Sequence, residues 1–341
     1  MFNKYVTVSF LLAASLFIGC QDHPPVSSSV PVVTTLVSGL AGPIGVETDG
    51  KGRIFVTEQG TGQNDGRVSE VTADGKVYPV ITGLYSFKRP DNELDATDHL
   101  LIANGILYVL NAKGLYRLNL ASFKTGDTPI PASSLTPEYI QQFVLDHNFT
   151  QDTGESHLYN MILGPDGSLY FTDAAANAII RRSPSGQLSV VTEVPGIPNP
   201  NPAGPPPGPP FIQSVPTSIT FDSRQFAIST LLGFPFPAGK SIIYQMDLTG
   251  KLTVYQQGFN SLVDIENDGY GRYFVLEHAV FGPTGFMANT GRLLRAKGTG
   301  TDVLISGLNL PTDLRFSDAH TAYITTLGNG PSNGALLKVT F

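Results

Sequence analysis

The sequence lacks the features of a disulfide-linked, nucleic-acid-binding or helical protein. Its one cysteine, Cys20, cannot form an intramolecular disulfide or a paired-cysteine metal motif. Only 14% of the residues are charged, and with 21 lysines and arginines against 28 acidic residues we expect no nucleic-acid partner. Neither a phosphate-binding loop nor the Ser-His-Asp order of a hydrolase stands out. In contrast, 36 glycines and 26 prolines favour many short strands joined by tight turns over a helical bundle.

The N-terminal residues have the pattern of a bacterial export signal. Lys4 precedes an apolar run over residues 6–18, which is too short to span a bilayer comfortably as a helix. The glycine and cysteine that follow resemble the lipobox of bacterial lipoproteins, although Phe17 stands where leucine is usual. Ordinary secretion with a chance cysteine is the alternative. We predict lipid anchoring in the cell envelope (periplasmic or at the outer-membrane surface), with a signal peptide over 1–19, lipidation of Cys20 and a flexible tether over 20–31.

One structural unit recurs six times after this segment. Its clearest copy, Asn160–Asp173, is an alternating strand, a Gly-Pro-Asp-Gly turn and a second strand of the type Leu-Tyr-Phe-Thr-Asp. Similar copies cover 45–58 and 264–277, and in all three copies we expect the second strand to begin nine residues after the first residue of the copy. The copies start 46 to 61 residues apart, which fits four-stranded propeller blades with loop insertions. We therefore predict an all-β fold, a six-bladed β-propeller over residues 32–341, and a monomer.

The two ends of the predicted propeller complement each other. The last copy supplies three strands and ends at residues 336–341, so its blade lacks a fourth strand. Val32–Leu40 matches the fourth strands of other copies, such as 303–308. Pairing both ends in one blade would close the ring and remove two exposed sheet edges.

Chain direction in a propeller places two sets of residues at one mouth of the central channel. The innermost strand of each blade starts on the face where the second strand ends. We expect the long insertions on that same face, where binding usually occurs: 121–156, 195–214, 231–240, 278–291 and 326–334. The first set contains Gly45, His99, Asn160, Ser218, Asp264 and Asp313. The second set contains Glu58, Asn111, Asp173, Leu231, Glu277 and Thr326.

Carboxylates from adjacent blades are expected to converge at this mouth. Asp264, Asp313, Glu58 and Glu277 would repel one another unless water, a proton or a cation intervened. One hypothesis is a divalent cation such as Ca²⁺, held by Asp264, Asp313 and Asn160, with His99 as a further ligand. The alternative is that these residues are the polar lining of a wet channel.

Further candidates lie in the loops around the mouth. His157, just before the third inner strand, and Glu277 are candidates for proton transfer. Phe234 and Phe236 lie in an unusual Gly-Phe-Pro-Phe-Pro loop, which is either an aromatic binding surface or a lid packed on its neighbours.

The same loop carries a family resemblance. Ser214–Phe221, Thr230–Gly239 and the segment 258–264 resemble the hallmark sequences of the ScyD/ScyE family, named for proteins associated with biosynthesis of the pigment scytonemin. The resemblance implies a six-bladed propeller that is often exported and has no settled activity. The turns of the repeat are shared with NHL and gluconolactonase-like propellers. His157-Leu-Tyr departs from the family's usual Asn-Pro-Tyr.

Two functions remain open on the sequence. The first is a lipid-anchored propeller that binds a small molecule or an envelope protein at its loop-rich face, through Asp264, Asp313, Asn160, His99, Phe234 and Phe236. The second is a metal-dependent hydrolase or lactonase of the gluconolactonase-like type, in which a cation would polarise a carbonyl and activate water. There, His157 or Glu277 would move the proton.

Overall fold

The structure is a computed structural model that describes residues 30–90, 92–202, 208–328 and 332–341. Residues 31–341 form one compact unit. The predicted signal peptide, Cys20 and nearly all of the predicted tether lie outside the described residues. No helix in the described ranges is long and apolar enough to cross a membrane.

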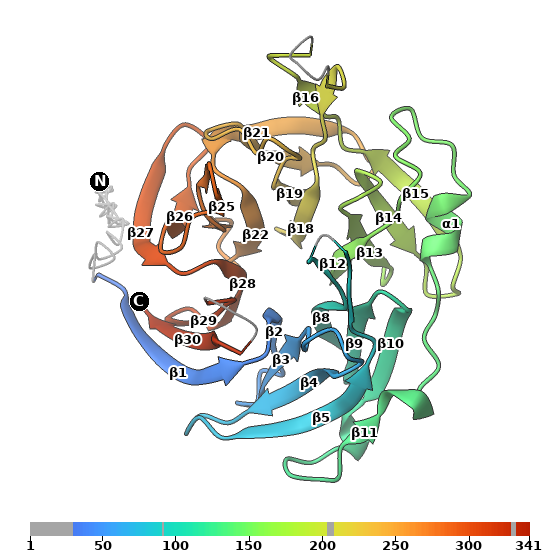
Figure 1. The fold of residues 1–341 in the computed structure, drawn as a ribbon, viewed down its shortest axis with the longest axis vertical. Coiled ribbons are helices and arrows are strands. Elements are labelled where there is room, and N and C mark those ends of the chain that lie inside the picture. The colour runs from blue at the N-terminus through green and yellow to red at the C-terminus, as the bar shows by residue number, and fades with distance from the viewer. Residues whose placement is uncertain (1–29, 91, 203–207, 329–331) are drawn as a thin grey trace, which may run out of the picture. The chain divides into compact units, whose positions relative to one another are not determined.

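The described strands form a ring of six blades around a central channel, as the sequence predicts (Figure 1). Blade one contains β2 (Pro43–Thr48), β3 (Ile54–Glu58), β4 (Gly66–Val71) and β5 (Val77–Leu84); blade two contains β8 (Thr97–Ala103), β9 (Ile106–Asn111) and β10 (Gly114–Asn119). Blade three contains β12 (Leu158–Leu163), β13 (Leu169–Asp173), β14 (Ala178–Arg182) and β15 (Leu188–Glu193); blade four contains β18 (Pro216–Phe221), β19 (Phe226–Thr230), β20 (Ser241–Met246) and β21 (Leu252–Phe259). Blade five contains β22 (Leu262–Asn267), β23 (Tyr273–Glu277), β26 (Gly291–Ala296) and β27 (Thr301–Leu308); blade six contains β28 (Pro311–Asp318), β29 (Thr321–Thr326), β30 (Gly334–Thr340) and β1 (Val32–Leu40).

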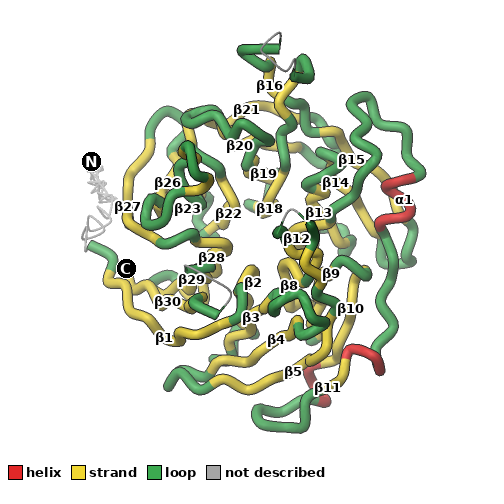
Figure 2. The backbone as a smooth tube through the Cα atoms, in the orientation of Figure 1, coloured by secondary structure: helices red, strands yellow, loops and turns green. Residues whose placement is uncertain are grey.

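Short strands and helical turns accompany the strands of the six blades. Strands make up much of the backbone, and the helical turns lie at the periphery of the ring (Figure 2). The two-residue strands are β6 (Phe87–Lys88), β7 (Leu94–Asp95), β11 (Ile130–Pro131), β16 (Ile197–Pro198), β17 (Phe211–Ile212), β24 (Phe281–Gly282) and β25 (Gly285–Phe286). The helical turns are η1 (Leu120–Ser122), η2 (Ala132–Ser134) and α1 (Gln141–Leu145).

The second strands of the blades are buried between neighbouring blades. All five residues of β3 and all five of β13 are buried, because neighbouring blades cover both faces of each sheet. Phe171 packs in the core between blades two and three, and Phe55 in the core between blades one and two. The core is therefore a series of inter-blade clusters around the channel.

The N-terminal strand closes the ring as predicted. β1 pairs antiparallel with β30, from Val32 opposite Thr340 to Leu40 opposite Gly334. Figure 1 shows these two ends of the chain side by side in blade six. Contacts between β1 and β30, which lie near the two ends of the described chain, therefore hold blade six together.

Blade two departs from the four-stranded pattern. In the described chain its sheet has three strands, and the insertion after β10 takes the path of the missing fourth. In this segment, β11 pairs in parallel with β5 of blade one, and Glu138 forms an antiparallel bridge with Leu115 of β10. The segment then reaches the mouth near His157. The insertion over 121–156 thus starts at the opposite end of blade two, and only its last residues lie at the mouth, unlike the sequence expectation.

Candidate functional site

The inner strands of all six blades share an irregularity near their start. Each shows a register shift against the second strand of its blade, and such bulges change the direction of the side chains around them. In blades three to six the shift immediately precedes a residue of the first predicted set. The shifts lie between Pro43 and Val46, Thr97 and Leu100, Leu158 and Asn160, Pro216 and Ser218, Leu262 and Asp264, and Pro311 and Asp313.

These residues surround a narrow cavity of about 80 Å³ in the channel. Its lining alternates along the inner strands, as expected for side chains with a period of two. One layer contains Asn160, Ser218, Asp264 and Asp313, and a second layer two residues further along contains Glu47, Glu266 and Arg315. The structure therefore brings together four residues of the first predicted set.

Asp264 and Asp313 each accept a hydrogen bond from the inner strand of the next blade. The Asp264 Oδ2 accepts from the Leu314 peptide N–H at 2.9 Å, and the Asp313 Oδ2 accepts from the Val46 N–H at 2.6 Å. Both side chains are buried, and their carboxyl groups hydrogen-bond to each other. Burial raises the pKa of Asp264 to about 7, and burial together with the Asp264 charge raises the pKa of Asp313 well above its usual value. The pair thus retains a proton near neutral pH.

His99 and Asn160 also join neighbouring blades. The His99 Nδ1 donates to the Tyr159 carbonyl at 2.9 Å, and the Asn160 Nδ2 donates to the Ser218 Oγ at 3.2 Å. Burial lowers the pKa of His99 to about 4, so this imidazole is neutral, and its Nε2 lies 3.6 Å from the Asp313 Oδ1. Gly45 permits this packing, because a Cβ there would lie 2.9 Å from the His99 Cα.

The second layer contains an ion-pair cluster that the sequence reading missed. The Arg315 Nε lies 2.7 Å from Glu47 Oε1, and its Nη1 lies 2.7 Å from Glu266 Oε1. Both glutamates are shielded from solvent, so the guanidinium balances charge that would otherwise be costly to bury. Glu47, Glu266 and Arg315 each lie two positions after a member of the first predicted set. The repeat spacing could therefore have predicted all three.

The second predicted set does not converge on the channel as expected. The Glu58 Oε1 pairs with Arg67 Nε at 2.6 Å, and the Glu277 Oε2 pairs with Arg292 Nε at 2.6 Å. Each arginine lies directly opposite its glutamate on the third strand of the same blade. The expectation that both glutamates face Asp264 and Asp313 is therefore wrong, because a cross-strand arginine already neutralises each one. Glu277, a candidate for proton transfer, is buried in this ion pair.

His157 lies at the mouth and is half exposed, with 50% of its side chain accessible. Its Nε2 lies 3.0 Å from the Oδ2 of Asp98, a buried residue within the blade-two bulge. The Asp98 carboxylate raises the pKa of His157 to about 9. The ring of Tyr159 packs edge-on against both His157 and His99. The mouth thus presents an imidazolium beside an aromatic ring, and its partner Asp98 was not among the residues predicted from the sequence.

Replacing Asp98 with asparagine should lower the pKa of His157 from about 9 toward about 6.5, the ordinary value for histidine, because the raising charge is removed. The measurement is the pH titration of the His157 ring protons by NMR. The unaltered protein, titrated under the same conditions, is the reference. An unchanged His157 titration would show that the ion pair does not form.

Four phenylalanines form an aromatic cluster on the insertion-bearing face. Phe236 contacts Phe281 and Phe286 with ring centroids 4.7 and 4.9 Å apart, and Phe234 packs at 6.2 Å from both Phe236 and Phe281. Phe234 remains 75% exposed, whereas the other three rings are partly buried. The loop therefore packs on its neighbours through Phe236 and presents Phe234 to solvent.

The proposed cation ligands have few free oxygens in this arrangement. One oxygen each of Asp264 and Asp313 is bound by a backbone N–H, and the two carboxyl groups also bond to each other. The Asn160 Oδ1 accepts from the Met161 N–H at 2.6 Å. Across the described ranges, no three His, Cys, Asp or Glu side chains are grouped to hold a metal ion. The raised pKa values of the two aspartates indicate that a proton can relieve the repulsion between them.

The architecture defines the chain as a six-bladed β-propeller, and comparison with solved structures agrees. The aldose sugar dehydrogenase of Streptomyces coelicolor, in its PQQ-bound form, is 14% identical, with 91% of this chain and 98% of that chain covered and a TM-score of 0.59. A gluconolactonase-like protein is 14% identical, with 91% and 92% covered and a TM-score of 0.54. Virginiamycin B lyase from Staphylococcus aureus is 16% identical, with 91% and 99% covered and a TM-score of 0.51.

No protein-family model matches the sequence. No curated protein matches it either. Since the three structures are at most 16% identical to this chain, they establish its fold and not its activity.

Proposed function

We propose that this protein is an exported, lipid-anchored propeller of the cell envelope that binds a small molecule at its insertion-bearing mouth. The observation that carries the proposal is the exposed Phe234 ring above the cluster formed by Phe236, Phe281 and Phe286. An exposed aromatic side chain on a supported base is a typical apolar contact for a ligand. The propeller acts as a rigid, monomeric support for this surface.

The charge of the mouth narrows the class of ligand. His157 is half exposed and, with its raised pKa, carries a positive charge at neutral pH. The acidic groups nearest to it are already engaged, because Asp98 pairs with His157 itself and Asp173 accepts from Ser156 and the His157 N–H. A ligand with an anionic group fits this charge, and a ligand with an aromatic or apolar body fits the Phe234 surface.

The resemblance to the ScyD/ScyE family supports the same location for the proposed ligand site. The segment that carries it, Thr230–Gly239, supplies both Phe234 and Phe236. Membership in that family, lipidation at Cys20 and the envelope location are parts of the proposal. An envelope protein docking on the same aromatic surface is the other occupant that this site could take.

Binding of anilinonaphthalene sulfonate, an aromatic sulfonate, tests the proposal. We expect Phe234→Ser to weaken binding about tenfold or more, since burying a phenylalanine contributes roughly 1.5–3 kcal/mol. His157→Gln should weaken it further by removing the positive charge. The measurement is a fluorescence titration, with melting temperatures to show that both variants fold.

Tyr270→Ala, an exposed aromatic residue on the opposite face, is the matched control and should bind like the unaltered protein. Equal affinity in the Phe234 and His157 variants and the unaltered protein would refute a ligand site at this mouth.

A further inference from the structure

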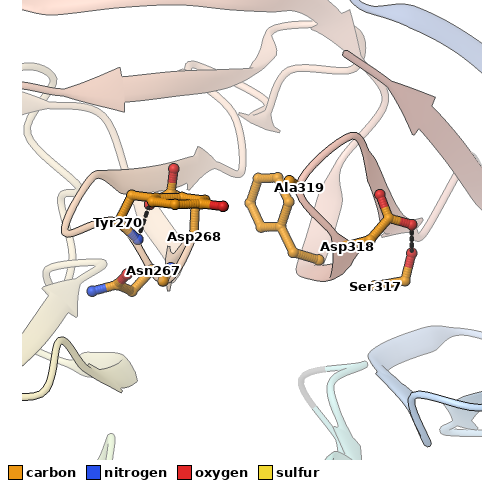
Figure 3. A pocket seen from close by; sticks show the side chains of 8 residues that line it. Asn267, Asp268, Tyr270, Ser317, Asp318 and Ala319 are labelled. Carbon is orange, nitrogen blue, oxygen red and sulfur yellow. Dashed lines mark hydrogen bonds between the residues drawn. The ribbon is translucent and has the colours of Figure 1, made fainter. Parts of the chain in front are cut away.

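A second hollow lies on the face opposite the insertion-bearing mouth. It has a volume of about 540 Å³ and lies between the β22–β23 turn and the β28–β29 turn of blades five and six. Figure 3 shows Asn267, Asp268 and Tyr270 on one side of it, and Ser317, Asp318 and Ala319 on the other. We call this hollow the turn cleft. Its volume is in the range of about 300–1,000 Å³ that small-molecule sites occupy.

The turn cleft combines an exposed aromatic ring with a supported one. Tyr270 is 76% exposed at its edge. Phe316, which also lines the cleft, is partly buried, and its ring packs against Phe274 at 4.8 Å and stacks on Phe341 at 5.6 Å. These neighbours hold the Phe316 ring in place, so the cleft presents apolar surface with little freedom to collapse.

Hydrogen-bonding groups border these rings. The Asn267 Oδ1 accepts from the Gly269 N–H at 2.7 Å, whereas its Nδ2 is buried and has no hydrogen-bond partner in the described chain. Because the Asn267 Nδ2 is fully buried, it is not available to a ligand in the cleft. On the other side, the exposed Asp318 carboxylate accepts from the His320 N–H at 2.8 Å, which lowers the pKa of Asp318 and keeps it ionised as an acceptor.

The charges of the turn cleft exclude several ligand classes. The Asp318 carboxylate would repel an anionic ligand. A metal ion would find too few free carboxylates, because Asp268 is paired with Arg272 and also accepts from the Tyr270 N–H. A neutral ligand that has both apolar faces and many hydroxyl groups satisfies the rings and the Asp318 acceptor together.

We propose that the turn cleft binds a neutral oligosaccharide, with one sugar ring lying against Tyr270 and Phe316 and its hydroxyl groups bonding to Ser317 and Asp318. This site is independent of the ligand proposed for the mouth, since the two lie at opposite ends of the inner strands. A propeller with both sites would hold a small molecule on one face and a glycan on the other.

The test is calorimetric titration of the full chain with maltotriose, cellotriose and chitotriose as separate probes. At least one trisaccharide should bind, Tyr270→Ala should weaken it at least tenfold, and Asp318→Asn should weaken it several-fold. Tyr270 is largely exposed, so its substitution should leave the melting temperature unchanged. Phe234→Ser, on the other face, is the control and should bind the trisaccharide normally.

Two results would overturn the proposal. One is that none of the three trisaccharides binds at millimolar concentration. The other is that binding survives Tyr270→Ala, or is lost in Phe234→Ser, which would place the sugar outside the turn cleft. Because anilinonaphthalene sulfonate binding does not involve Tyr270, these results leave the test of the mouth unaffected.

Discussion

Replacing Leu40 with alanine should destabilise the protein by roughly 2–5 kcal/mol, the usual cost of truncating a buried leucine. Leu40 is 2% exposed and belongs to a core cluster with Val46 of blade one and Leu336 of β30. It therefore stabilises the only blade that is built from both ends of the chain. Its loss creates a cavity at the junction where the ring closes.

The measurement is chemical unfolding followed by circular dichroism. Val33→Ala, on the same strand, is the control: Val33 is 38% exposed, so we expect a change within about 0.5 kcal/mol. Similar midpoints for the two variants would mean that β1 contributes little to closure. A larger slope change in the Leu40 variant would instead indicate partial opening before global unfolding.

The aspartate pair in the channel should contribute stability that falls as the pH rises from about 4 to about 7. The folded pKa of Asp264 is raised to about 7 from an ordinary value of 3.8, so the folded protein holds protons that the unfolded chain releases. This contribution is complete below the unfolded pKa and is lost as the pH rises through the folded pKa. The rise from 3.8 to about 7 corresponds to roughly 4 kcal/mol across that window.

Asp264→Asn should flatten this part of the pH profile and make the protein more stable than the unaltered chain at pH values above about 7. The asparagine Oδ1 can still accept from the Leu314 N–H, while the repulsion with Asp313 is removed. Unfolding free energies across the pH range give the measurement, and the exposed Asp152→Asn variant is the control. If the unfolding free energy of Asp264→Asn had the same pH dependence as that of the unaltered protein, the proposed shared proton would be contradicted.

The same experiment tests the cation hypothesis and, with it, the metal-dependent hydrolase. If Ca²⁺ occupied the pair, adding it above pH 7 would raise the melting temperature of the unaltered protein but not of Asp264→Asn, and a chelator would reverse the gain. We expect no calcium effect, because backbone N–H groups and the mutual hydrogen bond already occupy the aspartate oxygens. A calcium-dependent gain would support the metal site and favour the metal-dependent hydrolase, the alternative function.

The sequence predicted the blades well because each blade is a local pattern. Starting from residue 160, the second strand was expected nine residues later, and β13 begins at Leu169. The same spacing from 264 leads to Tyr273, where β23 begins. Alternation, turn residues and strand length all lie within one repeat, so they can be read without knowing what packs against them.

Channel geometry was harder to predict, since it depends on contacts between blades and across strands. The sequence placed Asp264 and Asp313 together correctly, because both hold the same position in their repeats. It could not show that Glu58 is matched by Arg67, which depends on the register between β3 and β4. It also missed Asp98, because the blade-two bulge brings this residue to His157 over a separation of 59 positions.

The sequence by itself determined the fold, the number of blades and the strand that closes the ring, since repeat spacing and apolar alternation specify these locally. Only the tertiary structure decided what the polar residues do. Burial, register and the next blade's backbone turn two aspartates into a proton-sharing pair, two glutamates into arginine partners and one histidine into a cation. The charge state of a side chain depends on the neighbours that folding brings to it, and those neighbours come from distant parts of the chain.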